Sequence, residues 1–259
     1  MIKAMYTAAA GMNAQQTEVD VIANNLANVN TNGFKRSQTN FEDLLYVTMR
    51  QPGSPVSNGS TMIGLQVGSG ARLVSTSKVF TAGTLLETSR PLDIAITGDG
   101  FFELAGLNGE RFFTRDGHFN LDANGAIVNA AGLKLQPEIT IPPNAQDLSI
   151  AADGTISYTI DDTQQQAGQL TIVRFVNSAG LSSNGQNLFR FTGSSGDPVT
   201  EIPGQNGAGE LRQGMIERSN VDVATELIEL IIAQRAYEVN SKAISSSDEM
   251  LGTVNNMVR

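Results

Sequence analysis

Apolar residues recur at alternating steps of three and four at both ends of the chain. Near the N-terminus the positions are Met5, Ala8, Met12, Gln15, Val19, Ile22, Leu26 and Val29. Near the C-terminus they are Leu230, Ala233, Tyr237, Asn240, Ile244, Ser247, Leu251, Val254 and Val258. This spacing is typical of the a/d seam of helices that pack on other helices. We therefore predict a coiled-coil-like helical domain built from both termini, residues 1–33 and 219–259.

Capping and turn-forming residues set the expected limits of these helices. Asn32 and Gly33 form a helix stop, because glycine tolerates the left-handed conformation that follows a helix end. The sequence SNVD at 219–222 is a capping box, in which a hydroxyl precedes a carboxylate by three residues. The C-terminal helix should then span 222–258, roughly 55 Å at 1.5 Å per residue. Its apolar face is broad and also includes Ala236, Ala243, Met250 and Met257.

Two interpretations of the terminal helices stay open at this point. They can close a monomer as an antiparallel pair, or they can also pack against helices of other copies. A single partner helix does not cover so broad a face, and isolated helices gain most of their stability from packing. The end of the first helix, NNLANVNTNGFKR, is rich in asparagine. These amides either cap and solvate a helix end or belong to a surface that packs without charge.

The middle of the chain is predicted to be β-structure. All glycines except Gly11, Gly33 and Gly252 lie within 53–214, and residues 92–96 and 155–160 alternate between apolar and polar. Three short strands are expected in 111–132, separated by hairpin turns at Asp116-Gly117 and Asn124-Gly125. The fold class is therefore α+β, with central all-β, hairpin-rich domains. We predict an extended β connector from 34–96 and 188–218 and a β-rich outer domain at 97–187.

The segment 50–70, RQPGSPVSNGSTMIGLQVGSG, is rich in glycine, serine and proline. Its composition fits a disordered linker and a long extended hairpin equally well.

Composition excludes several classes of function. The formal net charge of −9 disfavours a nucleic-acid partner, whose binding depends on lysine and arginine, and Lys35-Arg36 is an isolated basic pair. The chain has no cysteine, so neither disulfides nor thiolate metal sites form. No stretch reaches the roughly 18 apolar residues of a membrane span. The first residues lack the apolar run of a secretory signal peptide, so a cleaved signal is not expected.

No catalytic constellation is visible in the sequence. His118 is the only histidine, which excludes a multi-histidine metal site, and it is read as an exposed strand residue after a turn. The carboxylates Asp99, Asp116, Asp122 and Asp153 are assigned to hairpin tips, where turn chemistry explains aspartate. We expect no enzyme activity, no metal and no cofactor.

Three segments carry a resemblance that covers the whole chain. They are AAAGMNAQQTEVDVIANNLANVNTNGFKR near the N-terminus, GLQVGSGARLVSTSKVFTAGTLLETSRPLDIAITGDGFFEL in the middle and GMIERSNVDVATELIELIIAQRAYEVNSKAI near the C-terminus. They resemble the axial rod and hook proteins of the bacterial flagellar basal body, and within them the distal part of the rod. A proximal rod paralogue is the alternative within the same family. A secreted monomeric β-domain, an adhesin or hydrolase with a helical clasp, is the alternative outside it.

The resemblance implies a self-assembling helical tube that crosses the periplasm as a drive shaft and encloses an export channel. The expected partners are other copies of this chain, proximal rod proteins, the hook protein, the surrounding rings and the flagellar type III export apparatus. Export without cleavage is implied too. In such a tube the end of the first helix is surrounded by copies of itself, so amides there avoid a repeated like charge.

These expectations assign three groups of residues. The subunit-packing group comprises Met5, Met12, Val19, Ile22, Leu26, Val29, Asn24, Asn25, Asn28, Leu230, Tyr237, Ile244, Leu251 and Val258. The channel-lining stripe, polar but weakly charged, comprises Gln234, Ser241, Ser245, Asp248 and Asn255. The rod-stiffening segment, which resembles the one that distinguishes the straight rod from the hook, contains Gln51, Pro52, Gly53, Met62, Ile63, Gly64, Leu65 and Val67.

Overall fold

The computed structural model of the chain describes residues 2–51, 55–56, 59–60, 63–106, 109–161 and 163–257. Its contacts divide the chain into two compact units. Unit 1 contains residues 1–26, 37–77 and 222–259, and unit 2 contains residues 27–36 and 78–221. The strands of 37–77 are thus grouped with the helices, whereas the sequence pattern assigned them to a separate connector.

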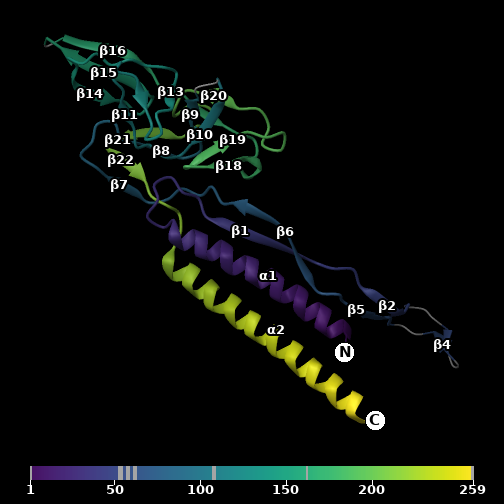
Figure 1. The fold of residues 1–259 in the computed structure, drawn as a ribbon. Coiled ribbons are helices and arrows are strands. Elements are labelled where there is room, and N and C mark those ends of the chain that lie inside the picture. The colour runs from purple at the N-terminus through teal and green to yellow at the C-terminus, as the bar shows by residue number, and fades with distance from the viewer. Residues whose placement is uncertain are drawn as a thin grey trace. The chain divides into compact units, whose positions relative to one another are not determined.

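The two helices of unit 1 run antiparallel, so the two ends of the chain lie at the same end of the pair (Figure 1). Helix α1 spans Ile2–Ala27 and helix α2 spans Val223–Met257. Asp222 is the N-cap of α2, because its carboxylate accepts a hydrogen bond from the amide of Thr225 at 2.9 Å. The capping box that we expected from Ser219 is therefore wrong. The Ser219 hydroxyl accepts from the amide of Val221, one turn before the helix begins.

The first helix ends earlier than the sequence pattern predicts. Residues 28–33 form successive turns instead of helix, since asparagine and β-branched valine favour helix weakly there. Gly33 has a φ of +67°, and a Cβ atom at this position would lie 2.6 Å from the backbone nitrogen of Asp116. Gly33 is thus required for a close approach of two backbones within unit 2, and not for a helix end.

Residues 37–78 form a long, interrupted two-stranded ribbon. Its outward strands are β1 (Ser37–Asp43), β2 (Val47–Arg50) and β3 (Pro55–Val56), and its return strands are β4 (Gly59–Ser60), β5 (Leu65–Val67) and β6 (Ala71–Lys78). β1 pairs with β6, β2 with β5 and β3 with β4. Of the two conformations that the composition of 50–70 allows, the described residues thus adopt the hairpin.

Unit 2 is built from antiparallel sheets (Figure 1). The largest has seven strands in the order β11 (Asn120–Leu121), β12 (Ile127–Val128), β13 (Lys134–Gln136), β9 (Phe102–Ala105), β10 (Arg111–Thr114), β19 (Leu188–Arg190) and β18 (Ser182–Gly185). A second has three strands, β14 (Gln146–Ile150), β15 (Thr155–Ile160) and β16 (Thr163–Gln169). Paired strands complete the unit: β17 (Ile172–Arg174) with β20 (Val199–Glu201), β8 (Ile94–Thr97) with β21 (Glu210–Gln213), and β7 (Leu85–Glu87) with β22 (Met215–Glu217).

Two hydrophobic clusters hold unit 2 together. The larger one contains Ile94, Ile96, Phe102, Leu104, Phe119, Leu135, Ile156, Leu170 and Ile172, all at most 1% exposed. The smaller one is mainly aromatic and contains Phe101, Phe113, Val173, Phe175, Leu181 and Phe189. Aromatic rings there meet edge to face, with the centroids of Phe113 and Phe175 separated by 4.9 Å.

The predicted turns are only partly correct. β11 and β12 form the expected hairpin at Asn124-Gly125, but only the glycine has a positive φ, and its amide donates to the carbonyl of Asp122. Asp116-Gly117 is not a hairpin turn, because β10 pairs with β9 and β19 while Gly117 approaches Ile94. Asp116 and Asp99 accordingly lie outside hairpin tips. The α+β class is confirmed, with helices at both termini and a β-rich region between them.

Candidate assembly surfaces

The buried side chains along the seam between α1 and α2 are mostly small or polar. They are Ala8, Ala14, Ile22 and Asn25 on α1 and Glu226, Ala233 and Ser247 on α2, and Ile22 is the one large apolar residue among them. At Gly11 the missing side chain leaves room for Asn240 of α2. A Cβ atom added to Gly11 would lie 2.9 Å from the side-chain nitrogen of Asn240. One face of α2 is thus used within the chain itself.

A buried amide fixes the register of this seam. Asn25 is 1% exposed, and its Nδ2 donates to the Glu226 carboxylate at 3.1 Å and to the carbonyl of Ser37 at 2.9 Å. Its Oδ1 accepts from the Ser37 amide at 2.8 Å. Asn25 therefore connects both helices to the start of β1. The sequence pattern placed this asparagine in contacts between copies, whereas these partners lie in its own chain.

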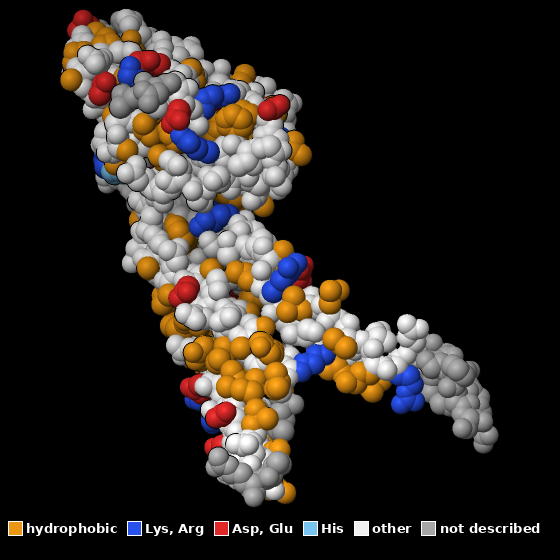
Figure 2. Space-filling model, turned by 45° about the vertical axis from the view of Figure 1, so that its right-hand side comes forward, with side chains coloured by type: hydrophobic (Ala, Val, Ile, Leu, Met, Phe, Trp, Pro, Cys, Tyr) orange, Lys and Arg blue, Asp and Glu red, His pale blue; other side chains and the backbone are white. Residues whose placement is uncertain are grey.

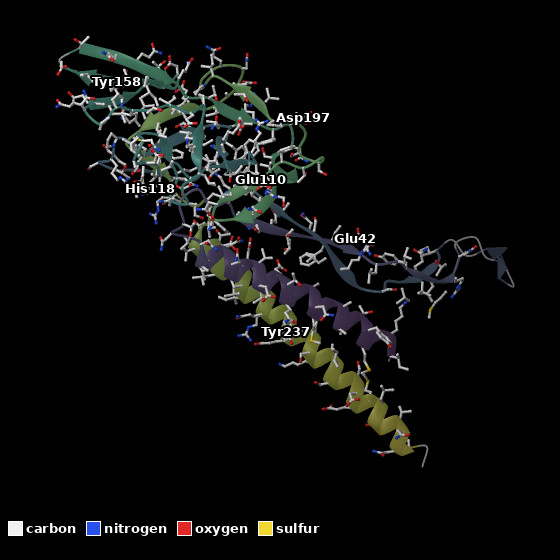
Figure 3. All side chains as sticks on the ribbon, turned by 45° about the horizontal axis from the view of Figure 1, so that its top comes forward. Glu42, Glu110, His118, Tyr158, Asp197 and Tyr237 are labelled. Atoms are coloured by element: carbon white, nitrogen blue, oxygen red, sulfur yellow. The ribbon has the colours of Figure 1, made fainter. Side chains whose placement is uncertain are left out.

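The other predicted packing residues are less buried in the single chain. Met5, Met12, Val19 and Leu26 are half-buried on α1, and Asn24 is exposed. Asn28 and Val29 lie beyond the helix in the turns that follow it, both half-buried. On α2, Tyr237 is exposed (Figure 3), and the half-buried members of the group are Leu230, Ile244 and Leu251. Val258 lies outside the described residues.

A second apolar face runs along α2. The sequence analysis assigned its C-terminal half, Val254, Met250 and Met257, to the seam and its flank, and missed its N-terminal half, Ile228, Ile232 and Val239. This face is made of residues that are 47–80% exposed in the chain: Ile228, Ile232, Val239, Met250, Val254 and Met257. We call these residues the outer face of α2. Figure 2 shows hydrophobic side chains gathered on the helical part of unit 1. These residues follow one another at steps of three, four, seven and eleven, which are helical spacings that could have indicated a second face, but they were overlooked beside the more regular seam.

The polar stripe lies on the side of α2 away from this outer face. At about 100° per residue, Ser241 is on roughly the opposite side of the helix from Ile232. Ser241 is half-buried, and its carbonyl accepts a hydrogen bond from the Ser245 hydroxyl. The exposed members of the stripe are Gln234, Ser245, Asp248 and Asn255. α2 therefore carries three different surfaces: the seam to α1, the outer face and the polar stripe.

The hairpin of unit 1 exposes further apolar side chains. Val47 pairs with Val67, and Arg50 with Leu65, across β2 and β5. The exposed apolar residues of this part include Leu45, Met49, Ile63, Leu65 and Val67, with Leu45 89% exposed. Of the other residues assigned to stiffening, Gln51 is exposed and Gly64 is half-buried. Pro52, Gly53 and Met62 lie outside the described residues.

A buried ion cluster fixes the connectors within unit 2. The Lys35 ammonium donates to Glu217 Oε1 at 2.6 Å and to the carbonyl of Thr81 at 2.8 Å. Arg115 Nη1 lies 3.7 Å from Glu217 Oε2, and the Gly83 amide donates to Oε1. The three charged side chains are at most 2% exposed. Burial lowers the pKa of Lys35, and the neighbouring Glu217 carboxylate opposes this shift.

His118 is also less exposed than the sequence analysis predicted. It is half-buried and forms a β-bridge with Asp93. Its Nδ1 lies 3.0 Å from Asp93 Oδ1, and its Nε2 lies 2.7 Å from Arg90 Nη1. These neighbours give it a structural role in unit 2. Among the described residues, no group of three or more histidine or acidic side chains is placed to bind a metal.

Known protein families match three segments of the chain, one near the N-terminus, one in the middle and one near the C-terminus. Residues 5–35 match the family described as flagella basal body rod protein. Residues 95–158 match the flagellar hook protein FlgE/F/G D1 domain, and residues 212–257 match the flagellar basal body rod FlgEFG protein C-terminal. The basal-body rod protein FlgG of Buchnera aphidicola from Schizaphis graminum is 49% identical over 254 residues, covering 97% of this chain and 98% of the relative. The chain belongs to the flagellar basal-body rod protein family.

Other members of this rod family are similar over their whole length. FlgG of Borreliella burgdorferi is 45% identical, with all of both chains covered. The hook-basal body complex protein FlhP of Bacillus subtilis is 31% identical over 99% of this chain and all of its own. The hook protein FlgE2 of Helicobacter pylori, a solved structure, matches 70% of this chain and 43% of its own at 14% identity, with a TM-score of 0.24. That likeness is too distant to support an argument.

In the part of the chain that the structure describes, neither helix is long and apolar enough to cross a membrane.

Proposed function

We propose that the protein is a structural subunit of the distal rod, a helical homopolymer that transmits torque and encloses an export channel. The proposal is carried by the outer face of α2, whose large apolar side chains are 47–80% exposed in the single chain. Burying the exposed part of each of them in an assembly would contribute about 1–2 kcal/mol. The chain is 49% identical to a protein named as a rod protein and 31% identical to FlhP. This difference supports the assignment of the chain to the rod.

The proposed partners follow from this assignment. They are other copies of the chain, proximal rod proteins on one side, the hook protein on the other, surrounding rings and the export apparatus. The proposed location is the basal body where it crosses the periplasm, reached without signal cleavage. The subunit-packing residues on α1 and α2 are proposed to meet other copies together with the outer face.

Complementation tests this function. In a bacterium that lacks its own distal rod subunit, the chain should restore rods that carry hooks, as seen in isolated basal bodies. Short rods without hooks, or rods in which the chain occupies only the proximal part, would support the paralogue instead. A chain that accumulates outside the inner membrane as a monomer would contradict any role in the rod.

We propose that the polar stripe of α2 faces the export channel. It carries one charge in five positions, so it would hydrate passing chains without holding them electrostatically. Replacing both Ser241 and Ser245 by lysine should leave rod assembly nearly intact and slow the secretion of later subunits, because a ring of positive charge would retain acidic segments. Secretion is measured as hook protein released per cell. Unchanged secretion, or burial of both serines between helices, would contradict the channel assignment.

We propose that the hairpin around residues 50–70 stiffens the rod. Its exposed apolar residues would then be buried against neighbouring subunits. Replacing residues 51–64 by an Asn-Gly turn should keep unit 2 folded, because its strands lie elsewhere in the chain, and should give rods or tubes that bend more easily. Curvature and persistence length are measured on electron micrographs. A variant as straight and stiff as the original would contradict the assignment.

A further inference from the structure

The two larger sheets of unit 2 end in four terminal strands, which are β11, β18, β14 and β16. A terminal strand presents unpaired backbone N–H and C=O groups unless it is very short or covered. β11 has two residues. β14 is covered by the Gln213 side chain, which accepts from the amide of Ile150 at 3.0 Å and donates to the carbonyl of Leu148 at 2.8 Å. The other two edges are those of β16 and β18.

The edges of β16 and β18 are uncovered in the single chain. Among the described residues, the backbone of β16 hydrogen-bonds to β15 alone and the backbone of β18 to β19 alone. The first pair of the β15–β16 hairpin is Ile160 with Thr163. Such a pair is hydrogen-bonded in a tight hairpin, and the two kinds of pair alternate from there. The N–H and C=O groups of Gln164 and Gln166 therefore point away from β15, and by the same alternation those of Ser183 point away from β19.

Neither edge carries the residues that usually prevent strand addition. β16 has the sequence TQQQAGQ and β18 has the sequence SSNG, so both lack proline and charge. The first four residues of β16 and all of β18 are exposed. Their amide and hydroxyl side chains can both donate and accept hydrogen bonds, and the small serines of β18 leave room for the long glutamines of β16. The two strands can thus meet without burying an unpaired charge.

We propose that β16 of one copy pairs with β18 of the next copy, so that the sheets of unit 2 continue from subunit to subunit. This inference rests on the proposed helical polymer. A contact that propagates through such a polymer joins two different surfaces, whereas an edge that pairs with itself gives a closed two-fold dimer. β18 is the second uncovered edge of the two larger sheets. Figure 1 shows β16 and β18 at opposite ends of unit 2, as a contact repeated from copy to copy requires.

Amide hydrogen exchange of the full chain, as monomer and as assembled polymer, tests the pairing. The polymer is exchanged in D₂O, dissolved and measured by NMR. The amides of Gln164, Gln166 and Ser183 should exchange at least about tenfold more slowly in the polymer, because each gains a backbone hydrogen bond. The Gln165 amide, which bonds to β15 in both states, is the internal control and should slow less. Unchanged exchange at Gln164 and Gln166, or equal slowing of all three glutamines, would overturn the proposal.

Crosslinking identifies which edges meet, because the chain has no cysteine of its own. Polymer that carries Gln166→Cys with Ser183→Cys should crosslink between copies through a short bismaleimide. The matched control, Gln166→Cys with Ser149→Cys, places the second cysteine on the covered strand β14 and should not crosslink. Crosslinking of Gln166→Cys alone would show that β16 meets itself, which would overturn the proposal.

The two tests separate this strand pairing from the proposed function. The faces of α2 are unchanged in the cysteine variants, and if a variant does not polymerise, the exchange of the unmodified chain decides the question by itself. Polymer that forms normally but shows neither slowed exchange nor crosslinks refutes the strand pairing and leaves the rod function standing. An unmodified chain that does not polymerise refutes both.

Discussion

Replacing Ile232 and Val239 together by aspartate should abolish polymerisation of the chain while leaving the monomer folded. Both side chains are more than 60% exposed in the single chain, so the monomer loses little packing. About a third of each residue is already covered, so their burial between copies would contribute about 2–4 kcal/mol per subunit. Losing that contribution raises the concentration needed for assembly by a factor of at least about 30. Sedimentation and electron microscopy measure the polymer, and circular dichroism checks that the variant is folded.

The control for this prediction lies on the same helix. Gln234→Asp with Ser241→Asp adds the same two charges to α2 on the polar stripe, and should leave assembly nearly unchanged. If the outer-face variant assembles as well as the original chain, or if both variants fail equally, the outer face is not the main contact between copies.

Glu217→Gln should destabilise the chain by about 3–5 kcal/mol, because it removes the buried carboxylate that faces both Lys35 and Arg115. Glutamine retains the shape of the side chain and one hydrogen-bond acceptor, so the decrease in the free energy of unfolding reports the effect of removing the negative charge. The free energy of unfolding is obtained from urea denaturation of the monomer.

Glu138→Gln is the matched control for Glu217→Gln. Glu138 forms an ion pair with Lys134 in which both side chains are more than 40% exposed, so its loss should cost less than about 1 kcal/mol. Equal, small losses in the two variants would show that the Lys35–Glu217–Arg115 cluster does not stabilise unit 2.

The terminal helices and several strands could be predicted because their patterns are local and repeated. The three-four spacing located α1 and α2, and the alternation at 155–160 coincides with β15. The end of α1 was placed too late because Asn32-Gly33 also fits a turn that follows several residues after the helix. The hairpin turn at Asp116-Gly117 was wrong, since dipeptide preference does not reveal which strands pair.

The contacts of the buried polar residues could be predicted only in part, because they join residues that are far apart in the sequence. Lys35 and Glu217 are 182 residues apart in the sequence, so no local sequence pattern indicates that they form an ion pair. Lys35-Arg36 looked like an isolated surface pair, yet Lys35 is among the most buried side chains in the described part of the chain. Asn25 looked like part of a uniform amide-rich surface, whereas its contacts with Glu226 and Ser37 depend on the tertiary fold. Periodicity identifies faces of a helix, but it does not say which partner each face meets.

Cryo-electron microscopy of the assembled polymer would show whether copies of the chain assemble through the outer face of α2. We expect Ile232, Val239 and Met250 to pack against helices of neighbouring copies, with Gln234 and Ser245 toward the bore. A map in which Ile232 and Val239 face solvent or the bore, while copies meet only through unit 2, would contradict this expectation.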